Sequence, residues 1–547
     1  MSRSTADLDG NPKVQRPVLP RRAAGALGAL ALTLTLAGCF GSGSSSSLPG
    51  SDPASILPAS TLAYAQAVLR PTGTLAGDIN AASKRLLGIA NPGQQLDALI
   101  DKSAPAGASY EKDIRPWLGP RAGIALLRAG NGGTEYAVVL DAQDTAKAQA
   151  AVANKAFFAN KGSAPDSTTR ASYRGVSYTD DQTSKMVVGV VGQFVVATNS
   201  AAAFDATVDV EKGASSLASV GSYQQALGDD LGNAAGSVYV PVRKLVDLFS
   251  SSVSAGTERS LFSAVDGMIG NDVLYGSARF DASGALLDLG TLNAPSGASS
   301  SSPSSPAETN PIGSLPADSW IAVGATKIGP VLLKELGSLA KLGGSTAGSL
   351  NQSLSEIQLA TGVDVRGDLS SITTAGFFVS GTSSSSVNAA LVLGLQDAAK
   401  AQPIVGQLYK LATLLQSSVK GMSVSSLSQG STSSFTLTIP GLSQPIVIAA
   451  AGGHIVVALG QSSLSAATNG TATLADSAGY KSASALLGSG IQPIAYVNLA
   501  QIGSLAQSTG TSTSTAPITE LERLGSVAIG TGKIAGSEHV RVAIPGS

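Results

Sequence analysis

The stretch LPASTLAYAQAV at residues 57–68 decides the predicted fold, because the chain repeats its pattern as LPADSWIAVGA at residues 315–325. In both places a Leu-Pro-Ala sequence leads into a short apolar run with the composition of a buried strand. One such match could arise by chance. A duplication requires further pairs in the same order along the chain.

Four further pairs follow in order, with separations of roughly 250–260 residues, a period far longer than that of a solenoid repeat. They are DIR (113–115) and DVR (364–366), QDTAKAQ (143–149) and QDAAKAQ (396–402), FVVA (194–197) and IVVA (455–458), and YV (239–240) and YV (496–497). Five collinear pairs indicate a gene duplication. We therefore expect two homologous domains, residues 55–295 and 312–547, joined by a Ser/Pro-rich linker at 296–311.

Strand and helix patterns alternate within each expected domain. The run YAVVL at 136–140 is typical of a buried strand, and Asp144 is a suitable N-cap for a helix that continues to Ala156. Hairpins are predicted at 185–197 with a turn at 192–193, at 446–459 with a turn at 452–453, and at 273–291 with a turn at 281–284. The predicted fold class is α+β: two homologous tandem domains, each a mainly antiparallel sheet with helices on one face.

The start of the chain has the parts of an export signal. Arg16, Arg21 and Arg22 precede an apolar run at 23–38, and Leu36-Ala37-Gly38-Cys39 resembles the lipobox of bacterial lipoproteins. By that resemblance, residues 1–38 are a signal peptide that is removed, and Cys39 then carries the lipid. The alternative is an uncleaved membrane anchor, which needs about 20 apolar residues, whereas the run has 16.

The segment at 39–54 is rich in Gly, Ser and Pro, which is typical of a flexible tether. Together with the lipobox, it predicts a protein anchored through lipid on the extracytoplasmic face of the cell membrane. Arg21-Arg22 leaves open whether the chain uses the general or the twin-arginine export route.

Composition argues against several classes of function. The net charge is −1 and only 13% of residues are charged, so no nucleic-acid partner is expected. Cys39 is the only cysteine, and an intramolecular disulfide or a cysteine zinc site therefore cannot form. Aromatic residues are 4% of the chain, which disfavours stacking platforms for bases or sugars.

Three features together resemble the bacterial domain-of-unknown-function family 3352. They are the LPA(S/D)(T/S) sequence before an apolar strand, the duplicated plan and the N-terminal export segment. The resemblance would cover most of the chain after Cys39. It implies an extracytoplasmic two-copy protein, and it implies no established activity, cofactor or catalytic residue.

Few residues have the pattern of a chemical site. His454 and His539 are expected to be exposed at a hairpin turn and at a strand edge, which disfavours a Ser-His-Asp triad or a histidine metal cluster. Ser417 and Lys420 match the S-x-x-K spacing of penicillin-recognising enzymes, but the companion motifs of those enzymes are absent. The stretch at 525–533 fails the glycine spacing of a phosphate loop, and Ile534 replaces the needed hydroxyl.

The acidic residues are expected to have structural roles, since none lies in an EF-hand pattern. Adjacent acidic pairs are interpreted as solvated loop carboxylates: Asp180-Asp181 and Asp229-Asp230. Repeated Asp/Lys pairs are interpreted as a helix cap followed by a solvated lysine: Asp144/Lys147 and Asp397/Lys400. Repeated Asp/Arg pairs are interpreted as ion pairs before a strand: Asp113/Arg115 and Asp364/Arg366.

The sequence thus predicts no catalytic, cofactor-binding or metal-binding residue, and one modified residue, Cys39. Our leading hypothesis is a non-enzymatic binding or interaction module, anchored to the membrane by its lipid, with an apolar ligand or an envelope protein as its partner. One alternative is a structural envelope scaffold. Another is a Ser/carboxylate hydrolase, which requires polar side chains with shifted pKa values in one pocket.

Overall fold

The computed structural model describes most of the chain after the predicted tether. The described residues are 50–90, 93–94, 109–128, 133–153, 168–182, 185–228, 234–244, 273–292, 310–331, 333, 358, 364–381, 383, 386–417, 420–426, 433–508, 522–534 and 537–546. The predicted signal peptide at 1–38, Cys39 and all of the predicted linker except residues 310 and 311 lie outside this set. Within it, no helix has both the length and the apolar character that a membrane crossing requires.

The two Leu-Pro-Ala sequences form the same local structure. After the 3₁₀-helix η1 (Pro53–Ile56), Leu57 is buried, Pro58 forms a β-bridge with Ser216, and the Thr61 hydroxyl donates to the Pro58 carbonyl at 2.6 Å. After η5 (Pro311–Ser314) the contacts recur: Leu315 is buried, Pro316 bridges Thr473, and the Ser319 hydroxyl donates to the Pro316 carbonyl at 2.6 Å. The repeated sequence is therefore a packing element that fixes how the chain enters the sheet.

The described strands form one antiparallel sheet of 20 strands, and its first half comes from residues 63–292. Across that half the strands lie in the order β4 (Thr168–Tyr173), β5 (Val176–Asp181), β6 (Met186–Val191), β7 (Phe194–Thr198), β3 (Glu135–Ala142), β2 (Leu118–Arg128), β1 (Ala63–Val68), β8 (Gly236–Pro241), β9 (Val273–Asp281) and β10 (Gly284–Leu292).

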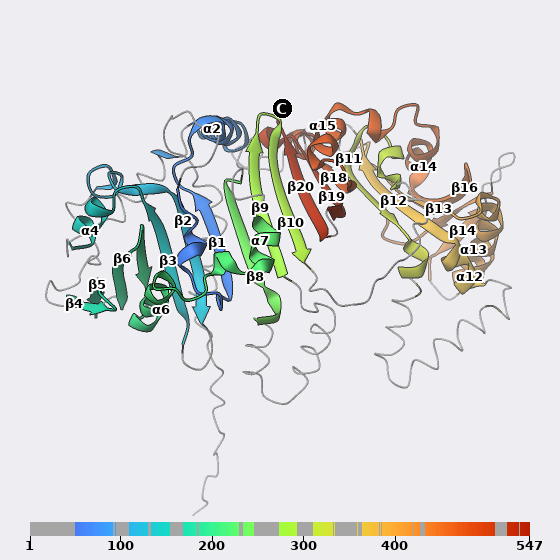
Figure 1. The fold of residues 1–547 in the computed structure, drawn as a ribbon. Helices are drawn as coiled ribbons and strands as arrows, with labels where there is room; N and C mark the ends of the chain where they lie inside the picture. Colours follow the sequence, from blue (N-terminus) through green and yellow to red (C-terminus); the bar gives the residue numbers. More distant parts are fainter. Residues whose placement is uncertain are drawn as a thin grey trace, which may run out of the picture.

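The second half of the sheet, from residues 319–545, has the same order. It runs β14 (Ser423–Ser426), β15 (Ser434–Thr438), β16 (Ile446–Ala451), β17 (His454–Leu459), β13 (Asn388–Leu395), β12 (Ile372–Ser380), β11 (Ser319–Thr326), β18 (Ile491–Asn498), β19 (Ser526–Ile534) and β20 (Ser537–Pro545). The halves meet where β10 pairs with β20, in the middle of the sheet (Figure 1). The mixed helical and antiparallel fold predicted from the sequence is confirmed, and both halves belong to a single large sheet.

Helices cover both faces of the sheet, so the prediction of helices on one face is wrong. The described α-helices are α2 (Gly73–Leu87), α4 (Thr145–Ala153), α6 (Ala201–Glu211), α7 (Gly221–Leu227), α12 (Val365–Ser371), α13 (Ala401–Gln416), α14 (Gly460–Asn469), α15 (Ala478–Leu487) and α16 (Leu499–Ser508). On β7, Val196 packs in the core with α6, whereas its neighbour Val195 packs in a second core with α4. Strands that are apolar at successive positions need cover on both sides, because successive side chains point to opposite faces.

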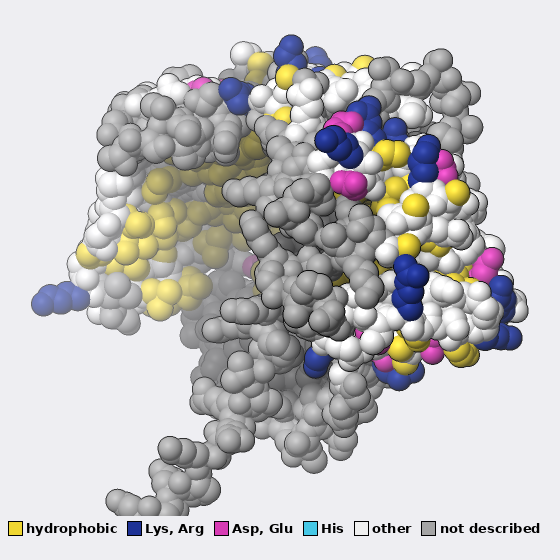
Figure 2. All heavy atoms as spheres, turned by 90° about the vertical axis from the view of Figure 1, so that its left-hand side faces the viewer, with side chains coloured by type: hydrophobic (Ala, Val, Ile, Leu, Met, Phe, Trp, Pro, Cys, Tyr) yellow, Lys and Arg dark blue, Asp and Glu magenta, His cyan; other side chains and the backbone are white. Residues whose placement is uncertain are grey.

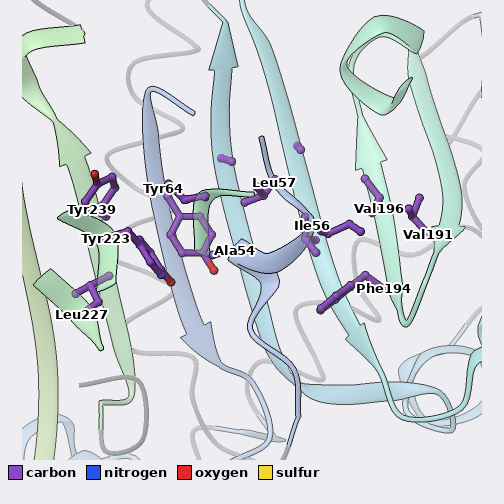
Figure 3. Close-up of a cluster of buried hydrophobic side chains, with 14 of the residues drawn as sticks. Ala54, Ile56, Leu57, Tyr64, Val191, Phe194, Val196, Tyr223, Leu227 and Tyr239 are labelled. Carbon is purple, nitrogen blue, oxygen red and sulfur yellow. The ribbon is translucent and has the colours of Figure 1, made fainter. Parts of the chain in front are cut away.

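The two largest hydrophobic cores, one in each half, lie on the face that α6, α7, α14 and α15 cover, which we call the closed face. Figure 3 shows Leu57, Tyr64, Tyr223 and Tyr239 in the core of the first half. The rings of Tyr223 and Tyr239 meet edge to face with centroids 5.3 Å apart, and in the second half Tyr480 and Tyr496 do so at 5.5 Å. The two halves thus repeat aromatic packing as well as strand order.

The predicted hairpins are confirmed. They are β6–β7, β16–β17 and β9–β10, and their turns fall within a residue of the predicted positions. Gly452 and Gly453, with φ of 57° and 79°, supply the left-handed backbone that the second turn requires. The packed chain begins earlier than the predicted boundary at residue 55, because Pro53 and Ala54 are already buried in η1.

Candidate functional site

The opposite face of the sheet, which we call the open face, carries exposed apolar side chains on its central strands. On β9, β10 and β20, side chains that point away from the closed face include Leu274, Leu287, Leu289 and Val540, which are 39%, 42%, 45% and 41% exposed. The β10–β20 register brings these apolar side chains together, since Leu289 lies opposite Val540 and Leu287 lies opposite Val542. A contiguous exposed apolar surface of this kind marks a binding surface more often than an isolated exposed leucine does.

The open face continues into both halves. Val323 on β11 and Phe377 on β12 lie opposite each other and are 44% and 39% exposed, and Tyr136 on β3 is also exposed. Towards the edges of the sheet, α4 and α13 cover this face, while α2 covers the end near the β9–β10 turn through Ala82 and Leu86. Figure 2 shows hydrophobic side chains gathered along the wall of a hollow. The middle of the open face therefore keeps an apolar surface that the surrounding helices leave exposed.

One end of the open face forms a hollow of about 520 Å³ with two chemical zones. Leu274, Leu289 and Val540 make its apolar part. Its polar part consists of two threonines and one loose ion pair: Thr291, Thr531, Lys533 and Glu538. The hollow therefore combines an aliphatic floor with a small polar end, a combination suited to an amphiphilic ligand.

A chain of buried polar side chains lies directly beneath this floor, on the closed face of the junction between the halves. The His539 Nδ1 lies 2.8 Å from the Asp288 Oδ1, and the His539 Nε2 lies 3.1 Å from the Tyr275 hydroxyl. Arg541 donates to the second Asp288 oxygen at 2.9 Å and to the Leu487 carbonyl, at the end of α15, at 2.7 Å. Asp288 therefore joins β10 to β20, and Arg541 joins β20 to α15.

Gly290 provides the space that this chain of contacts needs. It lies on β10 between Tyr275 on β9 and His539 on β20. A Cβ atom at Gly290 would clash with the Tyr275 ring. The glycine therefore lets the tyrosine cross β10 and reach the histidine. A carboxylate oxygen accepts in this contact, so the Nδ1–H of His539 donates to Asp288.

A second buried polar cluster lies where the chain enters the fold. The Asp52 carboxylate caps η1 by accepting from the Ala54 N–H at 2.9 Å, and it accepts from the Tyr223 hydroxyl at 3.1 Å. The Tyr64 hydroxyl lies 3.5 Å from the same carboxylate. Burial raises the pKa of Asp52 above its ordinary value of 3.8, although these hydrogen bonds act in the opposite direction. In the second half Asn310 caps η5 in the same way, at 3.0 Å from the Ile312 N–H.

Asp52 should make stability depend on pH. Because its folded pKa is raised, its contribution is complete below pH 3.8 and is lost as the pH rises through the folded pKa. Asp52→Asn keeps a cap like that of Asn310 and removes the titration. We expect the free energy of unfolding of the native protein, relative to Asp52→Asn, to fall in urea titrations as the pH rises from 3.8 through the raised pKa of Asp52. If the difference in free energy of unfolding between the native protein and Asp52→Asn does not change with pH, the raised pKa of Asp52 is contradicted.

Comparison with protein families matches residues 90–377 to a model described as "Protein of unknown function (DUF3352)". The match covers more than half of the chain. The chain belongs to this family. Comparisons with curated proteins and with solved structures find no match. Membership in DUF3352 confirms the family resemblance inferred from the sequence and brings no activity or site residue with it.

The two histidines of this DUF3352 chain differ in environment. His454 is exposed at the β16–β17 turn, as predicted, with Nδ1 3.0 Å from the Gly452 carbonyl. His539 was expected at an exposed edge, and this expectation is wrong, since the side chain is 8% exposed between β10 and β19. Alternation within β20 places His539 on the same face as Arg541, but it does not tell that other elements cover that face.

The S-x-x-K pair shows no catalytic geometry. Ser417 is exposed at the end of α13 and donates to the Leu414 carbonyl at 3.0 Å, and Lys420 is also exposed. Asp180 and Asp181 lie on β5, and Asp181 is 3% exposed, so the expectation of solvated loop carboxylates is wrong for this pair. Asp229-Asp230 lies outside the described residues. The stretch rejected as a phosphate loop belongs largely to β19.

The predicted helix caps are confirmed. The Asp144 carboxylate accepts from the Lys147 N–H at 3.0 Å, and this hydrogen bond is the main cause that lowers the pKa of Asp144. Asp397 accepts from the Ala399 N–H at 3.0 Å and caps η6 (Ala398–Lys400). Asp364 also caps a helix, since it accepts from the Gly367 N–H at 3.0 Å.

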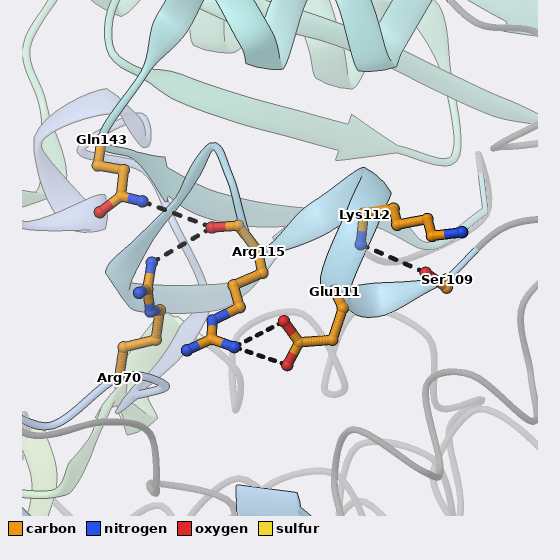
Figure 4. A network of polar contacts seen from close by, with 6 residues as sticks. All are labelled: Arg70, Ser109, Glu111, Lys112, Arg115 and Gln143. Carbon is orange, nitrogen blue, oxygen red and sulfur yellow. Dashed lines mark hydrogen bonds and ion pairs between the residues drawn. The ribbon is translucent and has the colours of Figure 1, made fainter.

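The first predicted Asp/Arg ion pair is replaced by another pairing. Arg115 binds Glu111 at 2.6 Å (Figure 4). Asp113 instead accepts from the Ser109 N–H at 2.8 Å. The π-helical turn η2 (Tyr110–Ile114) explains the exchange, because it places Glu111 and Arg115 four residues apart on one side. The Arg115 carbonyl accepts from Arg70, which follows β1, and from Gln143, which follows β3, and these contacts tie the turn to the ends of both strands.

The described residues hold no group of three or more His, Cys, Asp or Glu side chains arranged to bind a metal ion. Cys39, the one site residue predicted from the sequence, lies outside the described residues. The open face was missed at the sequence level. The alternation of the open-face side chains is visible in the runs ALLDLGTL (285–292) and HVRVAIP (539–545). Neither run tells which face of its strand other elements cover.

Proposed function

We propose that this protein is a lipid-anchored, non-enzymatic binding module on the extracytoplasmic face of the cell membrane, and that its open face holds the acyl chains of a membrane lipid. The observation that supports this most is the exposed aliphatic surface of Leu274, Leu287, Leu289 and Val540. Covering such a surface with an acyl chain contributes about 25 cal/mol for each Å² removed from water.

The proposed anchor would keep the open face close to its ligand. Gly50, where the described chain begins, lies beside Pro120 of β2 and Asp141 of β3 in the first half. The eleven residue steps from Cys39 to Gly50 reach about 40 Å at most when fully extended. A sheet held within that distance of the membrane surface has continuous access to membrane lipids, which favours lipid over a dilute soluble ligand.

We also propose that the two halves are homologous tandem domains that arose by duplication, with boundaries near 55–295 and 312–547. The identical strand order, the repeated η1 and η5 entrances and the repeated tyrosine pairs support this proposal. A duplication explains why the open face is continuous, because antiparallel pairing of the equivalent strands β10 and β20 puts the same face of both copies on one side.

The anchor has a direct test. Cys39→Ser should abolish incorporation of a labelled fatty acid, because no other cysteine can replace the lost sulfur. Globomycin should raise the mass of the native protein by blocking signal cleavage, and it should leave the mass of the variant unchanged. Acyl labelling that persists in Cys39→Ser would contradict the lipoprotein assignment.

Binding to the open face is tested by photo-cross-linking. The full anchored protein, in vesicles that contain a phospholipid with a diazirine in its acyl chain, should cross-link on peptides from β9, β10 and β20. Cross-links confined to the N-terminal peptide would reflect the anchor alone and would contradict the proposal. Cross-links to another envelope protein through these same strands would favour the scaffold alternative.

A further inference from the structure

Polar side chains of the hollow lie in one row across three adjacent strands, β10, β20 and β19, and we call this the polar row. Thr291 on β10 lies directly opposite Glu538 on β20, and Glu538 lies directly opposite Lys533 on β19. Leu274 on β9 completes the row, opposite Thr291. One anionic group, one cationic group and a hydroxyl therefore lie side by side across adjacent strands, about 5 Å apart.

The ion pair in this row is loose. The Lys533 Nζ and the Glu538 Oε1 are 3.7 Å apart, and the two side chains are 71% and 67% exposed. An exposed pair of this kind contributes little to folding. Both charged groups are therefore accessible to a ligand, and either can be replaced with little cost to stability.

Next to the polar row, apolar side chains of β10 and β20 form a surface about as long as an acyl chain. From Glu538 to Val542 the strand rises by about 14 Å, close to one leaflet of the membrane, which is about half of a 30 Å hydrocarbon core. At the far end of the same strands, Ala285 and Ile544 are covered by Leu86 of α2. The site is therefore polar at one end, closed at the other and aliphatic between them.

We propose that this hollow selects the head group of a zwitterionic phospholipid such as phosphatidylethanolamine. Its ammonium group binds Glu538, its phosphate binds Lys533 and accepts from Thr291 or Thr531, and its acyl chain lies along Leu289 and Val540. This inference rests on the proposed function and adds the class of lipid to it. An anionic head group with a phosphate and no ammonium group gives Glu538 no cation to bind. It also brings the phosphate close to the Glu538 carboxylate, and this repulsion disfavours an anionic lipid.

The test compares two photo-reactive phospholipids with the same diazirine acyl chain, one with an ethanolamine and one with a glycerol head group. Vesicles of equal phosphatidylethanolamine and phosphatidylglycerol content carry the full anchored protein. We expect the ethanolamine probe to cross-link to β9, β10 and β20 about three- to tenfold more than the glycerol probe. Glu538→Gln should bring that ratio close to one, and Lys533→Gln should lower the yield of both probes.

Glu111→Gln is the matched control, because it removes a carboxylate from another exposed ion pair, outside the hollow. It should leave both yields unchanged, and thermal unfolding should show that all variants are folded. Equal yields of the two probes in the native protein, or a preference for the glycerol probe, would overturn the head-group assignment and leave the proposed function standing. Absence of cross-links from either probe to the central strands would overturn both.

Discussion

Replacing Leu289 with glutamate is expected to reduce lipid cross-linking to the central strands at least tenfold. An acyl chain lying on the open face would bury the new carboxylate without a partner, which costs several kcal/mol, and each 1.4 kcal/mol is a factor of ten in affinity. The fold should tolerate the change, since the Leu289 side chain is 45% exposed. The measurement is the yield of diazirine cross-links on β9, β10 and β20 peptides, with thermal unfolding to establish that the variant is folded.

Leu414→Glu is the control for this experiment. Leu414 is 57% exposed on α13, away from the central strands, so the variant makes the same chemical change on a different exposed surface. It should cross-link as the native protein does. Equal yields for Leu289→Glu and the native protein, with both folded, would show that the open face does not hold the acyl chain.

Asp288→Ala is expected to lower the free energy of unfolding by about 3–5 kcal/mol, because it leaves the buried Arg541 without its carboxylate. Asp288 and Arg541 are 6% and 12% exposed, so water cannot replace the lost contact fully. The same change removes the partner of His539 Nδ1. Urea titration measures the loss. Glu111→Ala, which breaks an exposed pair, should cost at most about 1 kcal/mol.

A second variant separates the ion pair from general damage to the core. Changing both partners, as Asp288→Leu with Arg541→Met, should recover much of the stability lost in Asp288→Ala, because no unpaired buried charge remains. The single variants Asp288→Leu and Arg541→Met and the double variant form a cycle whose coupling term measures the interaction. Purely additive losses would show that Asp288 and Arg541 do not join the two halves.

Local patterns predicted the elements of this fold well. The turns of β6–β7, β9–β10 and β16–β17, and the caps at Asp144 and Asp397, depend on residues within a few positions of one another. Such contacts can be inferred from short stretches of sequence. The repeated Leu-Pro-Ala sequence was also informative, because both copies face the same packing problem at the entrance to the sheet.

The functional surface could not be predicted in the same way. His539 meets Asp288 and Tyr275 across sequence separations of 251 and 264 residues, so no local pattern reveals that it is buried. The pairing of β10 with β20 is equally distant. Both faces of β10 are partly apolar, and only the position of the covering helices decides that Leu287 and Leu289 remain exposed.

The lipid content of the natively purified protein distinguishes an open face that holds phospholipid from one that does not. The protein would be extracted from membranes without exchange of bound lipid, digested to release the lipid-modified N-terminal peptide, and measured by mass spectrometry for non-covalent phospholipid. We expect a phospholipid bound in stoichiometric amount to the native protein and depleted in Leu289→Glu. Absence of bound phospholipid from the native protein, or equal amounts in both proteins, would contradict it.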